Sequence, residues 1–308
     1  MTCKNCKIKP VITLPNTNIK LCKSCFIKYF EKKVAKTIRQ FKLIENNDNI
    51  IVGVSGGKDS ITTLYLLNKL PRKHQNIKVT ALLIDEGIKG YRNKTIEDAK
   101  KFCKEFKIKL KIVSYKKEMK YSLDEIKTKL KINNLCSICG VFRRYLLNKY
   151  AKKLKATKLA TGHNLDDEAQ SVIMNQFKNN IEISARLGPI TGIIKDPNFI
   201  PRIKPLYLLT EREVASYAFL KGFIGKFTEC PNAKFSFRND VRDMLNNFEE
   251  KYPGTKHSII SGFIELLPLL KEKYKKNASD LKACSICGEP SSKEICKACQ
   301  EMNKIKKL

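Results

Sequence analysis

Short apolar runs alternate with amphipathic stretches through the middle of the chain. Four runs rich in Val, Ile and Leu have the length and composition of buried strands, and they span residues 50–54, 79–84, 110–113 and 158–161. Apolar residues recur at helical spacing over the segments between them, 60–70, 93–107, 122–131 and 140–155. Short buried strands that alternate with such helices predict an α/β fold, in which helices cover both faces of a parallel sheet.

The pattern becomes helical on either side of this α/β part. Residues 26–44 have helical spacing and predict a helix that leads to the first strand. After Asp167, four further helices are predicted over 168–177, 211–221, 239–250 and 256–274. The second of these begins with a capping box, Thr210-x-x-Glu213.

The turn after the first predicted strand carries the clearest chemical signal. Residues 53–60 read Gly53-Val54-Ser55-Gly56-Gly57-Lys58-Asp59-Ser60 and lead into a helix. Free N–H groups and the positive helix end converge at such a turn, which suits a phosphate. The Walker-type loop requires Ser or Thr after its lysine, whereas Asp59 follows Lys58 here. The segment instead resembles the PP-loop of N-type ATP pyrophosphatases, which cleave ATP between its α and β phosphates; a ligand-free glycine turn is the alternative.

Other predicted strands end in residues that should lie beside this turn. Leu83-Ile84-Asp85 ends the second strand, and Thr161-Gly162-His163-Asn164-Leu165-Asp166-Asp167 follows the fourth. Ligands of open parallel sheets bind outside the carboxyl ends of the strands, so we predict the site at this edge. His163 would serve there either as a pocket residue or as a hydrogen-bonded loop residue.

Charged residues near this edge are candidates for handling phosphate. Asp59 and Asp167 are candidate Mg²⁺ ligands, because cleavage of ATP requires neutralised phosphate charge. Asp166 could replace Asp167, or the two could cap a helix. Lys58 is expected to stabilise developing phosphate charge, and Arg143 or Arg144 either reaches the same phosphates or lies on a solvated face.

Most of the twelve cysteines fall into spaced sets. The chain has no apolar stretch long enough to cross a bilayer and no apolar signal core, so we expect a cytoplasmic protein with metal-binding or catalytic thiols. Two sets have the spacing of four-cysteine zinc sites: Cys3, Cys6, Cys22 and Cys25 near the amino terminus, and Cys284, Cys287, Cys296 and Cys299 near the carboxyl terminus. Each module either contacts nucleic acid or caps the fold, and four thiolates leave zinc no open position for catalysis.

A third set joins Cys136-x2-Cys139 to the distant Cys230-Pro231. If the fold brings these thiols together, they supply three ligands without a fourth, which suits a [4Fe–4S] cluster with one open iron. Two other interpretations stay open: a zinc site completed by His or Asp, and free thiols in which Cys139 and Cys230 carry persulfide. Cys103 shares a predicted helix with apolar residues and is expected in the core.

The charge balance indicates a polyanionic partner. Lys and Arg number 61 against 30 Asp and Glu, which gives a net charge of +31. Nucleic acid is the leading candidate, although a basic proteome or a salt-rich cytoplasm would also produce such an excess. A membrane partner is not expected, because no basic amphipathic anchor is present.

These patterns divide the chain into four parts. Residues 1–30 form the predicted amino-terminal zinc module, and 31–48 the connecting helix. Residues 49–275 form the catalytic PP-loop domain with a helical carboxyl-terminal part, and 276–308 the second zinc module.

The combination of motifs resembles the tRNA 2-thiouridine synthetases, which include the T-loop and wobble-uridine tRNA thiolases. The resemblance covers nearly the whole chain, and it implies a PP-loop fold of the adenine-nucleotide α-hydrolase type flanked by zinc modules. It also implies a tRNA sulfurtransferase that adenylates the C2 oxygen of a uridine with ATP and Mg²⁺ and replaces this oxygen with sulfur. Position 34 is favoured as the target, and position 54 also fits.

The resemblance implies roles for individual residues. Cys136, Cys139 and Cys230 would hold the [4Fe–4S] cluster that delivers sulfur, and the turn from Gly53 to Ser60 would hold ATP. Leu83, Gly162 and Asp167 would complete the nucleotide site. Where relatives can carry a lysine four residues after the second cluster cysteine, this chain has Arg143, for which phosphate contact is expected.

The expected partners are tRNA and a sulfur donor, either free sulfide or a ubiquitin-like thiocarboxylate carrier, and a homodimer is one expectation for the assembly. Two other functions stay open. A PP-loop thiolase for tRNA cytidine is one, although that relative lacks terminal zinc modules. The other is a zinc-dependent RNA-binding protein that retains a PP-loop but releases no pyrophosphate.

Overall fold

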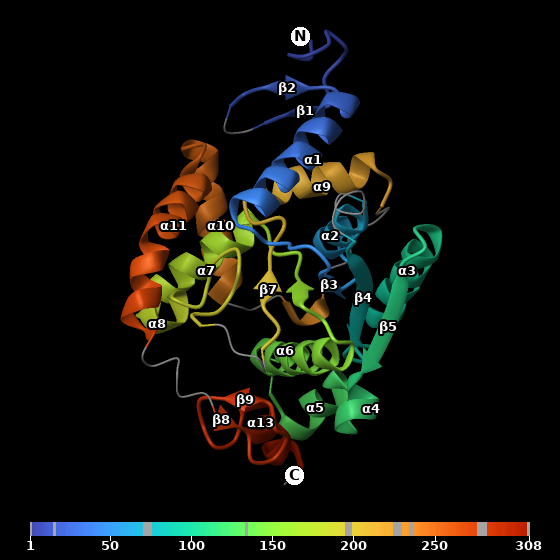
Figure 1. The fold of residues 1–308 in the computed structure, drawn as a ribbon, viewed down its shortest axis with the longest axis vertical. Helices are drawn as coiled ribbons and strands as arrows, with labels where there is room; N and C mark the ends of the chain where they lie inside the picture. The colour runs from blue at the N-terminus through green and yellow to red at the C-terminus, as the bar shows by residue number, and fades with distance from the viewer. Residues whose placement is uncertain are drawn as a thin grey trace.

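A five-stranded parallel sheet forms the centre of the molecule (Figure 1). The computed structural model describes residues 2–14, 17–69, 76–132, 135–194, 199–223, 230–233, 237–275 and 282–306. The strands are β3 (Asn49–Val54), β4 (Lys78–Asp85), β5 (Lys109–Ser114), β6 (Lys158–Ala160) and β7 (Arg202–Ile203), in the spatial order β5-β4-β3-β6-β7. The four predicted strands are confirmed. The two residues of β7 are too few for periodicity to indicate a strand.

Helices cover both faces of the sheet, as the alternation predicted. On one face, Ile51 packs with side chains of α4 (Tyr115–Met119), α5 (Leu123–Leu130) and α6 (Cys136–Lys153). On the other face, Ile50 and Val52 pack with side chains of α2 (Lys58–Lys69) and α3 (Arg92–Glu105). Cys103 of α3 is 3% exposed within this second cluster, which confirms its place in the core.

Two of the helices that begin earlier than predicted carry candidate site residues. The helix α6 begins at Cys136 rather than at residue 140, because the Cys139 N–H reaches the carbonyl of Leu135 at 2.9 Å and closes the first turn. The helix α7 (Leu165–Phe177) begins three residues before the predicted position, because Asn164 caps it. Cys136, Cys139, Asp166 and Asp167 therefore lie on first helical turns and not in loops.

The remaining described helices lie beside the sheet. One group comprises α1 (Lys23–Gln40), predicted over 26–44, and α9 (Glu211–Leu220). In the other group, α7, α10 (Phe237–Lys251) and α11 (Thr255–Lys273) pack around the fully buried Tyr207. The short helix α8 (Ile181–Ser184) contacts α7 and α11. The predicted capping box of α9 is confirmed, since Thr210 Oγ1 accepts from the Glu213 N–H at 3.2 Å.

The terminal modules lie at opposite ends of the long axis of the molecule (Figure 1). The hairpin of β1 (Ile12–Thr13) and β2 (Lys20–Leu21) precedes α1, so this helix starts inside the predicted module 1–30. The second module contains β8 (Lys282–Ala283), β9 (Pro290–Ser291) and a helix that its pattern did not indicate, α13 (Lys297–Lys306). The first six residues of the predicted segment 276–308 lie outside the described residues. None of the helices within the described part has the length and apolar content that a membrane crossing requires.

Candidate active site and metal centres

The turn between β3 and α2 is tied by its own serines. Ser60 Oγ accepts from the Ser55 N–H at 3.1 Å and donates to the Gly57 carbonyl at 3.0 Å. Ser55 Oγ accepts from the Gly57 N–H at 3.3 Å. These contacts close a compact turn at the amino-terminal end of a twelve-residue helix, where unpaired N–H groups and the helix dipole favour an anion.

Two glycines allow the backbone to approach this turn closely. Gly56 has φ +87°, and a Cβ there would lie 2.7 Å from the carbonyl oxygen of Thr95 in α3. At Gly162, which follows β6, a Cβ would lie 2.7 Å from the carbonyl carbon of Asp59 and 2.8 Å from the nitrogen of Ser60. The carboxyl ends of β3 and β6 therefore meet through main-chain atoms, at the edge of the sheet where the sequence placed the site.

Opposite charges are concentrated at the start of α2. The Lys58 ammonium lies 3.1 Å from Oδ2 of Asp59 and 2.8 Å from Oε1 of Glu211. Burial opposes the charge of Lys58, but the two carboxylates outweigh this effect and raise the pKa of the lysine. Burial raises the pKa of Asp59; Lys58 opposes this shift and the charge of Asp167 adds to it. The electrostatic coupling of the two aspartates is consistent with a shared divalent cation.

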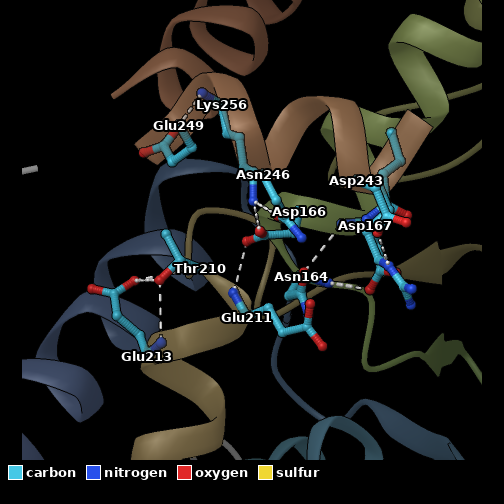
Figure 2. A network of polar contacts seen from close by, with 12 residues as sticks. Asn164, Asp166, Asp167, Thr210, Glu211, Glu213, Asp243, Asn246, Glu249 and Lys256 are labelled. Atoms are coloured by element: carbon cyan, nitrogen blue, oxygen red, sulfur yellow. Dashed lines mark hydrogen bonds and ion pairs between the residues drawn. The ribbon is translucent and has the colours of Figure 1, made fainter. Parts of the chain in front are cut away.

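The adjacent aspartates of α7 have different surroundings (Figure 2). Asp167 Oδ2 accepts from the Asn164 N–H at 3.2 Å, while its Oδ1 lies 3.7 Å from Arg238, and burial raises its pKa. Asp166 is buried and lies 2.5 Å from the Lys256 ammonium, and its Oδ2 accepts from the Glu211 N–H at 2.7 Å. Both carboxylates therefore serve helix ends, Asp167 in the capping box of α7 and Asp166 at the first N–H of α9. Asp167 is the more exposed of the two, with 34% of its side chain accessible against 8% for Asp166.

A large cavity opens beside these groups. It has a volume of about 1480 Å³ and is lined by Gly56, Gly57 and Lys58 at one end. From there it extends along residues of α3 and α9 to Glu250, in the last turn of α10, and to Pro253, which follows that helix. This volume exceeds the roughly 300–1,000 Å³ of ordinary small-molecule sites. The cavity shares the residues from Gly56 to Asp59 with the predicted nucleotide site, whereas Leu83, Gly162 and Asp167 are not among its lining residues.

The fold brings the three central cysteines to one side of the molecule. Cys136 Sγ lies 3.5 Å from the carbonyl oxygen of Asn232, two residues after Cys230. Burial raises the pKa of Cys139; Arg143 opposes this shift and the charge of Cys230 adds to it. Cys139 and Cys230 both pack against the core cluster that contains α6. Cys230 therefore lies on the same side of the molecule as Cys136, as a common site requires.

A buried bridge connects these cysteines to the glycine turn. Arg92, which is 3% exposed, donates from Nη1 to the Ser55 carbonyl at 2.7 Å and pairs through Nε with Glu86 at 2.7 Å. The other oxygen of Glu86 lies 3.9 Å from Arg143, whose charge acts on Cys139. The sequence reasoning missed both Glu86 and Arg92. The position of Glu86 directly after a strand end was the only available signal.

The surroundings of three predicted site residues limit the contacts that they can make with a ligand. The side chain of Leu83 is fully buried in the sheet core, so a contact with nucleotide would involve its main chain. Gly53 lies inside β3, two positions before the turn begins at Ser55. His163 Nδ1 lies 2.9 Å from Thr161 Oγ1, as the loop interpretation expected. Desolvation, with the charge of Lys204, lowers the pKa of His163 to about 4, although part of this residue is exposed to solvent.

In each terminal module the four Sγ atoms lie within 4.8 Å of one another. Cys6 and Cys22 are 3.3 Å apart and Cys287 and Cys296 are 3.7 Å apart, close to the roughly 3.8 Å edge of a tetrahedron with Zn–S bonds of about 2.3 Å. Across the described segments, no other group of His, Cys, Asp or Glu is as tightly gathered. The central cysteines are thus more widely spaced than ligands of a single zinc ion.

Both modules pack against the body of the protein. Cys3 and Cys22 are buried in the cluster formed by α1 and α9, and Cys284, Cys296 and Cys299 are buried in the cluster that includes α6. The fold-capping interpretation of the modules therefore has structural support.

The parallel sheet, the serine-tied glycine turn at its carboxyl edge and the paired charges beyond it define an α/β protein of the PP-loop class. The PP-loop domain family matches residues 28–248.

The chain belongs to the PP-loop family of tRNA 2-thiolation proteins. It is 40% identical over 300 residues to the tRNA-5-methyluridine(54) 2-sulfurtransferase of Pyrococcus horikoshii, covering 97% of this chain and 93% of that protein. It is 35% identical to cytoplasmic tRNA 2-thiolation protein 1 of Arabidopsis thaliana, covering 96% and 82% of the two chains. Its structure resembles that of the U34-tRNA thiolase NcsA from Methanococcus maripaludis with its [4Fe–4S] cluster, with a TM-score of 0.84 and 37% identity, over 99% of this chain and 96% of that one.

Proposed function

We propose that this protein is an ATP-dependent tRNA-uridine 2-sulfurtransferase. One observation carries the proposal beyond family membership: Cys136 and Cys139 lie on the same side of the molecule as the distant Cys230. Glu86 and Arg92 link Arg143, one helical turn after Cys139, to the PP-loop. A nucleotide site and a sulfur site that share one region are what a two-step oxygen-to-sulfur exchange requires.

The first step makes the uridine oxygen a leaving group. The C2 carbonyl of uracil is amide-like and a poor electrophile, so its oxygen attacks the α phosphorus of ATP. A P–O bond forms, the bridge to the β phosphate breaks and pyrophosphate departs. In this proposal Lys58 and the amino-terminal end of α2 hold the phosphates, while Asp59 and Asp167 bind the Mg²⁺ that neutralises them.

The second step replaces the activated oxygen. A sulfur nucleophile adds to C2, the C2–O bond breaks and AMP leaves with the oxygen. The three thiols of Cys136, Cys139 and Cys230 fit a [4Fe–4S] cluster, because they are three donors spaced more widely than the ligands of one ion. A cluster held in this way would supply an iron without a protein ligand, at which sulfide can bind. Arg143 lies beside Cys139 and could contact the departing phosphate.

The terminal modules would hold one Zn²⁺ each. Four thiolates complete the coordination of zinc, so neither ion takes part in the reaction. We propose that both ions stabilise the fold and that the basic surface of the protein binds the phosphates of tRNA.

Uridine 34 is our favoured target, because the U34 thiolase resembles this chain over almost its full length; position 54 is the other candidate, named in the Pyrococcus relative. We place the protein in the cytoplasm, with free sulfide or a thiocarboxylate carrier as the sulfur donor and a homodimer as one candidate assembly.

The test combines product analysis with a matched pair of cysteine variants. Protein purified without oxygen is incubated with tRNA, ATP, Mg²⁺ and sulfide, and the nucleosides of each tRNA fragment are analysed by mass. We expect 2-thiouridine with wild type, loss of thiolation but not of tRNA binding with Cys230→Ala, and normal thiolation with Cys103→Ala. We expect Asp59→Ala to abolish pyrophosphate release. A colourless preparation with full activity would contradict the cluster, and the absence of tRNA-stimulated pyrophosphate release would contradict the enzyme.

A further inference from the structure

Glu211, the first residue of α9, contacts the lysine of the PP-loop. Its Oε1 lies 2.8 Å from Nζ of Lys58, and the same ammonium lies 3.1 Å from Asp59. The Lys58 side chain is 17% exposed, whereas that of Glu211 is 45% exposed. The lysine is thus enclosed between two carboxylates, of which only Glu211 comes from outside the PP-loop.

The backbone of Glu211 is anchored while its side chain remains accessible (Figure 2). Its N–H donates to Asp166 Oδ2 at 2.7 Å. The other oxygen of Asp166 pairs with Lys256, and both side chains are 8% exposed. The Lys256 ammonium also lies 2.6 Å from Asn246 Oδ1. This network connects α7, α10 and α11 to the start of α9, so α9 is held in place while the Glu211 carboxylate can still turn away.

We propose that Glu211 is a counter-ion that the phosphates of a nucleotide must displace from Lys58. The inference rests on the proposed function, because it assigns Lys58 to phosphate binding. A carboxylate and a phosphate oxygen accept from the same ammonium, and their negative charges repel each other, so both cannot occupy the contact at full strength. Glu211 therefore weakens the binding of ATP and of pyrophosphate, and it assists release of the product once the α–β bridge has broken.

The decisive variant is Glu211→Gln, which keeps the shape of the side chain and removes its charge. We expect the dissociation constants of a non-hydrolysable ATP analogue and of pyrophosphate to fall about three- to tenfold, as for the loss of one partly exposed charge contact. Isothermal titration calorimetry at low salt measures both constants, with and without Mg²⁺. The increase in affinity should become smaller at high salt, because mobile ions screen the interaction between the charges.

Glu265→Gln is the matched control, since Glu265 is an exposed glutamate of α11 that does not line the cavity. Its dissociation constants should stay at the wild-type values. Tighter binding by Glu211→Gln cannot arise from a damaged fold, which would weaken binding. Unchanged binding would overturn the inference, and so would weaker binding that appears only with Mg²⁺, which would identify Glu211 as a metal ligand. If the wild-type protein binds neither probe, the proposed function fails instead.

Discussion

Gly162 offers the most direct test of how the site is assembled. A Cβ at this position would lie 2.7 Å from the carbonyl carbon of Asp59 and 2.8 Å from the nitrogen of Ser60. Both are main-chain atoms, so neither can rotate away, and Gly162→Ala must push the loop after β6 away from the start of α2. Overpacking of this kind costs about 1–3 kcal/mol of unfolding free energy. The displaced residues include Asp59, and a shift of about 1 Å in reacting groups reduces the rate roughly a hundredfold.

Two measurements separate these effects. Urea unfolding gives the stability of Gly162→Ala, and tRNA-stimulated pyrophosphate release gives its activity. Gly262→Ala is the control, because Gly262 is exposed inside α11 and a Cβ there would have no neighbour within 4 Å. This control should gain about 0.5–1 kcal/mol of helix stability and retain activity. Wild-type pyrophosphate release by Gly162→Ala would show that the close approach is not needed for the site.

Three further predictions concern the side chains of Asp167 and Lys256 and the zinc content of the protein. Partial burial raises the pKa of Asp167 above its ordinary 3.8, so its ionised form lowers the stability of the fold, by a small amount because the side chain is 34% exposed. Asp167→Asn should therefore unfold at slightly higher urea than wild type at neutral pH, and the difference should disappear as the pH falls through the raised pKa. Lys256→Ala leaves Asp166 without its buried partner and should lower the unfolding free energy by about 3–5 kcal/mol, against at most about 1 for the exposed Lys304→Ala. Cys284→Ser should reduce the zinc content from two ions per chain to one, measured by elemental analysis; two retained ions would refute the site.

The sequence predicted those parts of the site that depend on local order. A buried strand, a glycine turn and a helix follow one another without interruption from Asn49 to Lys69, so their chemistry could be inferred before the fold was known. The meeting of this turn with the segment after β6 followed from a rule of parallel sheets, because carboxyl ends of neighbouring strands share an edge. The spacing of the terminal cysteines likewise fixed two compact groups.

The parts that the sequence did not predict are contacts between distant segments. Lys58 and Glu211 are 153 positions apart, and nothing in the pattern around Glu211 indicated more than the start of a helix. Arg92 directly precedes the helix predicted over 93–107, yet it is buried against Ser55 and Glu86 because the start of α3 lies over the carboxyl ends of β3 and β4. Such pairings are decided by how helices dock on the sheet, which periodicity does not encode.

The helix α6 connects the central cysteines to the carboxyl-terminal cysteine module. Its first turn carries Cys136 and Cys139, and farther along the buried Asn148 donates to Glu289 of the carboxyl-terminal module at 2.6 Å. The helix α13 of that module also contacts α6. Because an α-helix transmits a displacement along its length, a zinc module docked at one end helps to fix the cysteines at the other. The PP-loop, in contrast, is anchored through α2 and α3 on the opposite face of the sheet. If this module holds zinc as proposed, removal of the ion should therefore disturb the central cysteines more than it disturbs nucleotide binding.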